Sequence, residues 1–355
     1  MRAHARINLD ALRHNLQRVR ELAPQSRVLA VIKANGYGHG MIEVAQALDS
    51  ADSYAVAAIG EALMLRQAGI EKDIVVLQGA SDETELLQAS QANISLVVHS
   101  ETQLHTLETS TLPSSIDIWI KIDTGMHRLG FEPQSARSHV KRLQQCDHVS
   151  SIRIMSHFAN ADDSSDALTS RQLQDFLECS DDLGLERSIA NSAGICASQN
   201  YHLDWVRPGI MLYGANPFLV DDKSDCRLQA VMTLSSHLIS VQQRKRGDAI
   251  GYGGSWVCPQ DMPVGVVSIG YGDGYPRHAR AGTPVLVNGI KVPLVGRVSM
   301  DMICVDLRPC PQAVAGDEVI LWGDGLPVEE VADSSDTIAY ELLCKLTGRV
   351  QFCYE

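Results

Sequence analysis

The sequence predicts an α/β protein in which an N-terminal (β/α)8 TIM-type barrel is followed by a mostly-β C-terminal domain. The chain has 355 residues, which is long for one ordinary domain. Its first half alternates short apolar runs with helical patterns, as βα units do. Its second half is rich in Val, Gly and Pro and carries short strand-like runs. We place the barrel at 10–225 and the β-rich domain at 226–355, with residues 1–9 as a candidate addition to the second domain.

The first half begins with a helix, because apolar residues from Leu9 to Leu22 recur at helical spacing. Asn8 or Asp10 is placed to cap it. Helical patterns at 61–68 and 171–183 lie between later apolar runs. Eight strand candidates in about 200 residues fit a barrel, although a doubly wound open sheet would alternate in the same way. The eight runs lie near 28–32, 54–59, 74–77, 94–98, 116–122, 152–155, 188–190 and 205–213.

The composition and pattern of the sequence change near residue 220. The polar segment 221–225 is a predicted linker. Strand-like runs follow it at 231–241, 264–269, 283–287 and 302–307, and they predict mostly antiparallel strands.

Composition excludes several classes of protein. The net charge of −13 provides no basic surface for nucleic acid. No apolar run is long enough for a membrane span, and the N-terminus lacks the apolar core of a secretory signal. The nine cysteines are scattered without a Cys-x-x-Cys pair, which predicts reduced thiols. The histidines show no metal spacing. We therefore expect a cytoplasmic protein without a metal, a membrane or nucleic acid as partner.

The first strand end carries a candidate reactive group. Lys33 directly follows an apolar run, and 33–40 reads KANGYGHG. At a barrel mouth, burial lowers the pKa of an amine and suits it to covalent bonding with a carbonyl. A surface lysine is the structural alternative, but the Gly and Asn residues that follow allow close approach of the backbone to a ligand.

Polar residues also follow the later strands. They lie at 124–130, 156–157, 191–192 and 207–209. Each of them could be purely structural, but together they converge on one barrel mouth. A serine hydroxyl and glycine N–H groups are typical of a phosphate-binding cradle.

The segment 33–40 resembles the pyridoxal-phosphate attachment motif of bacterial alanine racemases. The likeness continues in chain order and covers both predicted domains. The matching segments are 123–130, 156–159, 207–209, 251–254, 270–275 and 299–301. The resemblance implies pyridoxal 5'-phosphate as cofactor, a small amino acid as substrate, and a head-to-tail homodimer whose active sites are shared between subunits.

The resemblance also implies roles for individual residues. Lys33 would hold the cofactor covalently and act with Tyr252 as the catalytic acid/base pair. Lys121, often carbamylated in the family, would support Arg128. Substrate contacts would come from Arg128, Met300 and Tyr271, while Asp301 would support them. The other cofactor contacts would be Tyr37, His157, Ser192, Arg207, Gly209, Ile210 and Tyr340.

The reaction itself explains these residue types. Racemisation removes a proton from one face of the α-carbon and returns it to the other, which two fixed bases can do. A tyrosine base needs positive charge nearby, and the His157–Arg207 network is the predicted source. Because a guanidinium keeps its proton, Arg207 would leave the pyridine nitrogen of the cofactor unprotonated. This weakens the cofactor as an electron sink and limits side reactions.

Other interpretations stay open at this stage. Tyr252 and Tyr271 could pack Gly-rich turns, Met300 could be core, and Lys121 could pair with Asp123. A pyridoxal-phosphate decarboxylase shares the architecture but binds phosphate through a Gly-Gly-Gly-type loop, which is absent here. A racemase preferring serine or a basic amino acid is a second rival. A non-catalytic carrier of the cofactor would leave 226–355 without a purpose. D-alanine supply for peptidoglycan and alanine catabolism are both compatible roles.

Overall fold

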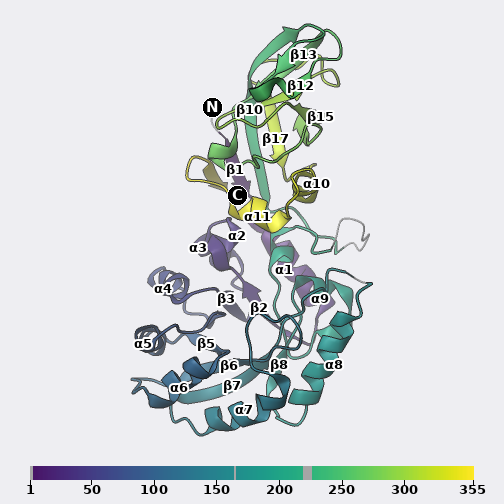
Figure 1. Cartoon of the computed structure of the whole chain (residues 1–355). Helices are drawn as coiled ribbons and strands as arrows, with labels where there is room; N and C mark the ends of the chain where they lie inside the picture. Colours follow the sequence, from purple (N-terminus) through teal and green to yellow (C-terminus); the bar gives the residue numbers. More distant parts are fainter. Residues whose placement is uncertain (1–2, 164, 219–225) are drawn as a thin grey trace.

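The computed structural model describes residues 3–163, 165–218 and 226–355. Two lobes lie one above the other, and the C-terminus lies near their junction (Figure 1). The predicted linker at 221–225 lies outside the described residues. Within the described ranges, no helix is both long and apolar enough to cross a membrane.

The lower lobe is a closed barrel of parallel strands (Figure 1). The barrel closes because the first strand pairs with both the second and the last, which rules out the open sheet. The predicted eight-stranded barrel is thereby confirmed for the described residues. Its strands are β2 (Arg27–Val31), β3 (Ser53–Val56), β4 (Ile74–Val76), β5 (Ser95–Val98), β6 (Ile116–Lys121), β7 (Val149–Met155), β8 (Glu186–Ser188) and β9 (Trp205–Val206).

Helices surround this barrel. The predicted first helix is confirmed, and the Asn8 side chain caps it by accepting the N–H of Ala11 at 2.9 Å. Its apolar stripe, which includes Leu12 and Leu16, is buried. The helices of this lobe are α1 (Leu9–Leu22), α2 (Lys33–Tyr37), α3 (Met41–Ala47), α4 (Ile59–Gln67), α5 (Glu83–Gln91), α6 (Glu101–Thr109), α7 (Ala136–Gln144), α8 (Leu168–Ser180) and α9 (Ser192–Ala197).

The upper lobe is built on a mostly antiparallel sheet with the order β13-β16-β15-β14-β17-β10-β1-β18. The N-terminal strand belongs to it, pairing antiparallel with β10 and parallel with β18. The bounds are β1 (His4–Ile7), β10 (Met232–Arg244), β13 (Met262–Val267), β14 (Pro284–Val287), β15 (Ile290–Val295), β16 (Ile303–Asp306), β17 (Glu318–Trp322) and β18 (Gln351–Tyr354). A hairpin, β11 (Ala249–Ile250) and β12 (Trp256–Val257), and two helices, α10 (Val328–Asp333) and α11 (Ala339–Cys344), complete it.

The two lobes meet where α11 approaches the end of α2. Gly38, with φ +81°, ends α2, and a Cβ there would lie 2.1 Å from the carbonyl oxygen of Leu343. Only glycine fits so close a backbone contact. The rings of Tyr37 and Tyr340 are also neighbours, with centroids 6.1 Å apart. The upper lobe therefore contributes α11 to the mouth of the barrel.

One expectation about the cysteines was wrong. In the described part of the chain, Cys196 and Cys226 form a disulfide, and the other cysteines are free. The Cα atoms of the pair are 6.3 Å apart, a separation that a disulfide spans. Singly scattered cysteines gave no sign of this contact because it joins α9 to a segment 30 residues further along the chain.

Candidate functional site

A cavity of ≈ 530 Å³ lies at the mouth of the barrel. Its walls come from the ends of the strands and from α11, which closes one side. The predicted site residues that line it are Lys33, Tyr37, Lys121, Arg128, His157, Ser192, Arg207, Gly209, Ile210 and Tyr340.

Lys33 is the first residue of α2, whose following residues form a left-handed turn rather than an ordinary helix. The four residues after it, Ala34 to Tyr37, have φ between 51° and 62°. Asn and Gly tolerate this conformation, but each of the two other side chains costs about 1–2 kcal/mol in it. Such strain persists only where the surroundings fix the backbone. The fixing contacts include the Asn35 side chain, which accepts the N–H of Met41 at 3.0 Å.

Buried aromatic rings pack against one another at the end of this left-handed turn. Tyr37 stacks on Tyr213, with centroids 4.7 Å apart, and the ring of His39 is tilted against Tyr213 at the same centroid distance. His39 Nδ1 lies 2.9 Å from the carbonyl oxygen of Tyr37 and 3.1 Å from that of Gly36, so it carries the proton. Burial lowers the pKa of His39 to about 4, which keeps the ring neutral.

Arg207 is buried and held by several acceptors. Its Nη1 donates to Ser188 Oγ at 2.6 Å, and its Nη2 donates to the carbonyl oxygens of Ser156 and Ile189. His157 Nδ1 accepts a further bond from Nη2 at 3.2 Å. Burial lowers the pKa of Arg207 to about 10, which still leaves it charged at neutral pH.

His157 is neutral in this surrounding. Burial and then the charge of Arg207 hold its pKa well below the ordinary value. A neutral ring whose Nδ1 accepts from Arg207 carries its proton on Nε2. Gln172 fixes the backbone here, because it donates to the carbonyl of His157 and accepts the N–H of Ala159.

Two amines share the same positive environment. Burial lowers the pKa of Lys33, Arg128 lowers it further, and Glu61 and Cys344 oppose the shift. Burial, followed by Arg207 and Arg128, lowers the pKa of Lys121 to about 8. Both amines are therefore more easily deprotonated than ordinary lysines, which makes them available as nucleophiles or bases.

Ser192 and the segment after β9 form a compact polar cradle. Ser192 Oγ accepts the N–H of Gly209 at 2.9 Å and that of Met211 at 3.4 Å. A Cβ at Gly209 would lie 2.6 Å from the hydroxyl of Tyr37, so glycine is what lets that hydroxyl enter. Among the described residues, the N–H of Ile210 meets no acceptor. The cradle thus gathers donors suited to an anion.

The second-lobe residues Tyr252, Tyr271, Met300 and Asp301 are absent from the lining of this cavity. Tyr252 is 69% exposed, Met300 52% and Tyr271 40%. Strand β12, which follows the Tyr252 turn, lies at the end of the upper lobe away from the barrel (Figure 1). Within one chain, the structure does not bring them to Lys33.

Tyr271 and Met300 nevertheless lie together. The N–H of Tyr271 donates to the carbonyl of Ser299 at 3.1 Å, and the N–H of Gly272 donates to that of Met300 at 2.8 Å. Arg349 joins the two loops through ion pairs, with Nε 3.1 Å from Asp273 and Nη2 2.6 Å from Asp301. Sequence reasoning missed Arg349, since nothing local distinguishes it.

Sequence reasoning also missed Ser188 and Glu61. Ser188 ends β8 and accepts from Arg207, and its place at a strand end was an available signal. Glu61 lies in the first turn of α4, where acidic residues are common at any helix start, so its pattern carried no special sign.

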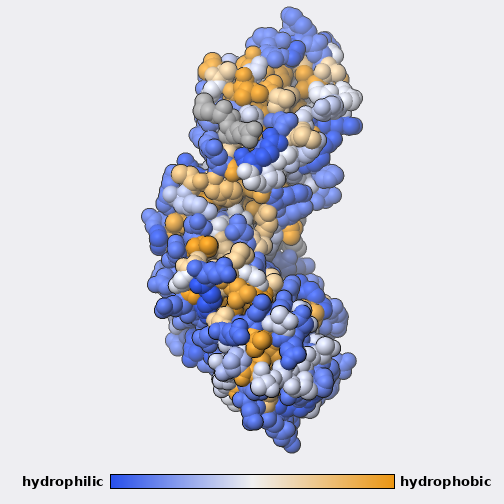
Figure 2. All heavy atoms as spheres, turned by 90° about the vertical axis from the view of Figure 1, so that its left-hand side faces the viewer, coloured by the Kyte–Doolittle hydropathy of each residue, from blue (hydrophilic) through white to orange (hydrophobic). Residues whose placement is uncertain are grey.

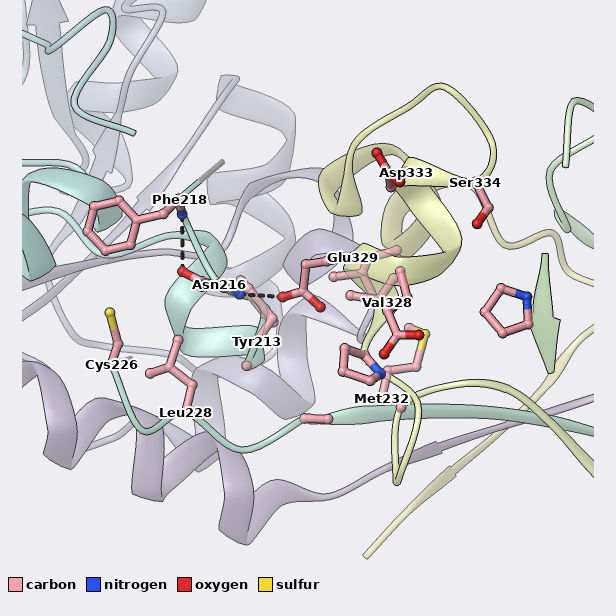
Figure 3. Close-up of a pocket in the computed structure, with 17 residues that line it drawn as sticks. Tyr213, Asn216, Phe218, Cys226, Leu228, Met232, Val328, Glu329, Asp333 and Ser334 are labelled. Atoms are coloured by element: carbon pink, nitrogen blue, oxygen red, sulfur yellow. Dashed lines mark hydrogen bonds between the residues drawn. The ribbon is translucent and has the colours of Figure 1, made fainter. Parts of the chain in front are cut away.

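A second cavity, of ≈ 590 Å³, lies between the lobes and contains none of the predicted site residues. Tyr213, Asn216 and Phe218 lie on one side of it and the residues of α10 on the other (Figure 3). The N–H of Asn216 donates to Glu329 across it. It lacks a buried amine, so the barrel mouth remains the candidate site.

A buried lysine among strand-end residues, in a barrel joined to a β-sheet lobe, defines a class of two-domain barrel enzymes. Comparison with sequence families makes the assignment specific. The model for "Alanine racemase, N-terminal domain" matches residues 7–217, and that for "Alanine racemase, C-terminal domain" matches 231–354. The chain belongs to the alanine racemase family.

Individual relatives agree with this assignment. The alanine racemase of Nitrosococcus oceani is 55% identical over 345 residues, which cover 97% of each chain. The crystal structure of the biosynthetic alanine racemase from Pseudomonas aeruginosa matches with a TM-score of 0.97 and 43% identity, covering 100% of both chains. The structure of alanine racemase from Bartonella henselae with covalently bound pyridoxal phosphate has a TM-score of 0.90 and 30% identity, again covering 100% of both.

Proposed function

We propose that this protein interconverts L-alanine and D-alanine with pyridoxal 5'-phosphate, as a head-to-tail homodimer. The observation that carries the proposal is the buried Lys33 amine beside an anion cradle and a buried arginine at the barrel mouth. A relative described as biosynthetic favours supply of D-alanine over catabolism.

The cavity fits the cofactor in size and in chemistry. Ligand pockets commonly measure about 300–1,000 Å³, and this one falls within that range. Ser192, the N–H of Ile210, and the hydroxyls of Tyr37 and Tyr340 would hold the phosphate. Lys33 would hold the carbonyl carbon of the cofactor covalently. The bound cofactor supplies delocalisation of the electron pair left when the α-proton of alanine departs.

Arg207 would face the pyridine nitrogen of the cofactor. Within the described residues its hydrogen bonds use Nη1 and Nη2, which leaves Nε for that contact. Because its pKa of about 10 keeps it protonated at neutral pH, it would donate a hydrogen bond without giving up the proton. This favours return of the α-proton over competing reactions.

Racemisation needs a second base on the opposite face of the substrate. Tyr252 is the candidate, and it can reach a barrel mouth only if that mouth belongs to another copy of the chain. The exposure of Tyr252, Tyr271 and Met300 supports such a contact, since exposed large apolar groups often mark interfaces. Hydrophobic side chains reach the surface in the upper lobe and in the waist below it (Figure 2).

Arg128 would bind the substrate carboxylate, and Lys121 would position Arg128. A neutral lysine amine reacts with carbon dioxide to give a carbamate, and the lowered pKa of Lys121 favours this. A carbamate would replace an unfavourable positive charge beside Arg128 and Arg207 with a negative one.

Circular dichroism of L-alanine tests the reaction. With pyridoxal phosphate added, we expect the signal of the amino acid to fall to zero while no pyruvate or carbon dioxide forms. Carbon dioxide would indicate a decarboxylase instead. A constant signal with L-alanine, but decay with L-serine, L-lysine or L-arginine, would overturn the substrate while keeping the racemase.

A further inference from the structure

Three consecutive βα units of the barrel close their loops in the same way. The side chain in the third position of each helix accepts the N–H four residues earlier. Glu61 of α4 accepts from Ala57 at 2.7 Å, and Glu85 of α5 accepts from Ser81 at 2.7 Å. Gln103 of α6 accepts from His99 at 3.0 Å. This contact stabilises each loop where it enters its helix, as capping residues do.

Glu61 makes one contact that Glu85 does not. Its second carboxylate oxygen, Oε1, accepts the N–H of Ala34 at 2.7 Å, in the loop of the preceding unit. Ala34 is the first residue of the left-handed turn and directly follows Lys33. One carboxylate therefore joins the end of β3 to the strained backbone that carries the amine.

The turn needs such an anchor. Ala34 has φ 52° and ψ 52°, a conformation that an alanine rarely adopts without a compensating contact. A bond from a backbone N–H to a carboxylate is about twice as strong as one to a neutral acceptor. We propose that Glu61 is a positioning residue that fixes the left-handed turn and aims Lys33 at the cofactor carbonyl. This inference rests on the proposed function.

The charge of Glu61 gives a second, separable signal. A negative charge near Lys33 favours its protonated form, so its removal should lower the pH at which the amine becomes neutral. The charged and titratable groups that face Lys33 from the surrounding elements are Glu61 of α4, Lys121 of β6, Arg128 of the following loop, His157 after β7, Arg207 after β9, Tyr37 of α2, and Tyr340 and Cys344 of α11.

The experiment compares Glu61→Gln with Glu85→Gln. Both residues are half-buried, occupy the same helix position and hold their own loop at the same distance, but only Glu61 touches the Lys33 turn. Full-length protein is freed of cofactor with hydroxylamine and mixed with pyridoxal phosphate over a range of pH. Absorbance gives the rate of covalent attachment, and borohydride trapping with peptide mass spectrometry locates the bond at Lys33.

We expect the attachment rate at the high-pH plateau to fall about tenfold in Glu61→Gln, since a charged hydrogen bond to the turn is lost. The midpoint of the pH profile should move to lower pH. Glu85→Gln should match the wild type in both. Glu61→Asp keeps the charge but is too short to reach both N–H groups, so its plateau should fall while its midpoint stays.

Equal effects of Glu61→Gln and Glu85→Gln, or a wild-type plateau in Glu61→Gln, would overturn the positioning role. Thermal unfolding of each variant identifies a general loss of folding. If Glu61→Gln does not fold, Glu61→Asp tests the positioning role instead. An attachment rate at high pH equal to that of the wild type in Glu61→Asp would overturn the inference. Wild-type protein that forms no bond at Lys33 would instead overturn the proposed function, and with it this role.

Discussion

At the scale of single residues, positive charge concentrated in a buried space governs the site. Lys33, Lys121, Arg128 and Arg207 surround one cavity, and no carboxylate of the described residues lines it. Burial and mutual repulsion lower the pKa of each of the two amines. The cost of crowding these charges is offset once an anionic cofactor and a carboxylate substrate enter.

Substitution of each of the two proposed bases should have a different effect on cofactor binding and on racemisation. Lys33→Ala removes the amine, so we expect no covalent bond to pyridoxal phosphate and no visible absorbance from it. Tyr252→Phe leaves that absorbance intact but should lower racemisation by at least about 100-fold, because proton transfer on one face loses its acid/base. Exchange of the α-proton in D2O, followed for each enantiomer, measures this. Full activity of Tyr252→Phe from both enantiomers would refute the two-base assignment.

Lys121 should show a pH-dependent modification. Its pKa of about 8 means that the amine is protonated and unreactive at lower pH and becomes neutral as the pH rises through that value. We therefore expect incorporation of carbon dioxide from bicarbonate to increase over this interval, as measured by mass spectrometry after chemical trapping. Lys121→Met should abolish it. If incorporation does not depend on pH, or persists in Lys121→Met, the proposed role of a carbamylated Lys121 in positioning Arg128 is contradicted.

Sequence could predict the residues that follow strands in recognisable motifs, such as Lys33 and Arg207. It did not reveal Glu61 or Arg349, and the strand-end position of Ser188 was a signal that was not used. Each of these acts through a contact with a distant segment, as when Arg349 reaches Asp301 across 48 positions. A local sequence pattern does not indicate contacts between segments that are distant in the chain.

At the scale of elements, the end of α2 must lie against α11. Gly38→Ala tests this contact, with Gly69→Ala as control, because φ is +81° at the first and +82° at the second while the second faces open space. We expect Gly69→Ala to cost about 1 kcal/mol in free energy of unfolding. Gly38→Ala should cost at least about 1 kcal/mol more and weaken cofactor binding, because Leu343 must shift. Urea unfolding measures both, and equal costs would exclude the close contact.

Arg349 should matter for the loops of the second lobe. Arg349→Ala removes the bridge between Asp273 and Asp301, which frees the loops that carry Tyr271 and Met300. If these loops contact substrate, KM for alanine should rise about tenfold while kcat changes less. Arg308→Ala, which breaks a local pair with Asp306 elsewhere in the lobe, is the control. Steady-state kinetics measure this, and an unchanged KM for alanine in Arg349→Ala would show that these loops do not contribute to substrate binding.

The barrel strands were predictable, and so were β10, β13, β14 and β16 of the second lobe, whereas β15, β17 and β18 were not. Buried parallel strands such as β3 and β5 are continuous apolar runs, which sequence reveals. Strand β9 has only two residues because the chain turns into a 3-10 helix at Ile210, so the run at 205–213 was too long. Strand β18 was missed because it is short and largely exposed.

At the scale of the whole molecule, the two proposed bases lie far apart within one chain. Lys33 and the cradle lie in the lower lobe, and the Tyr252 turn lies in the upper lobe. A head-to-tail pair would place each turn over the other barrel, with two equivalent sites related by a twofold axis. The proposed activity therefore requires the dimer.

Hybrid dimers test this claim most directly. Lys33→Ala and Tyr252→Phe proteins, each nearly inactive alone, are mixed, dissociated and reassociated, and racemisation is measured. If Tyr252 acts across the interface, half of the dimers contain one fully wild-type site. Activity should then recover to about a quarter of the wild-type value. Mixtures that stay as inactive as the separate variants, although subunit exchange has occurred, would contradict a site shared between subunits.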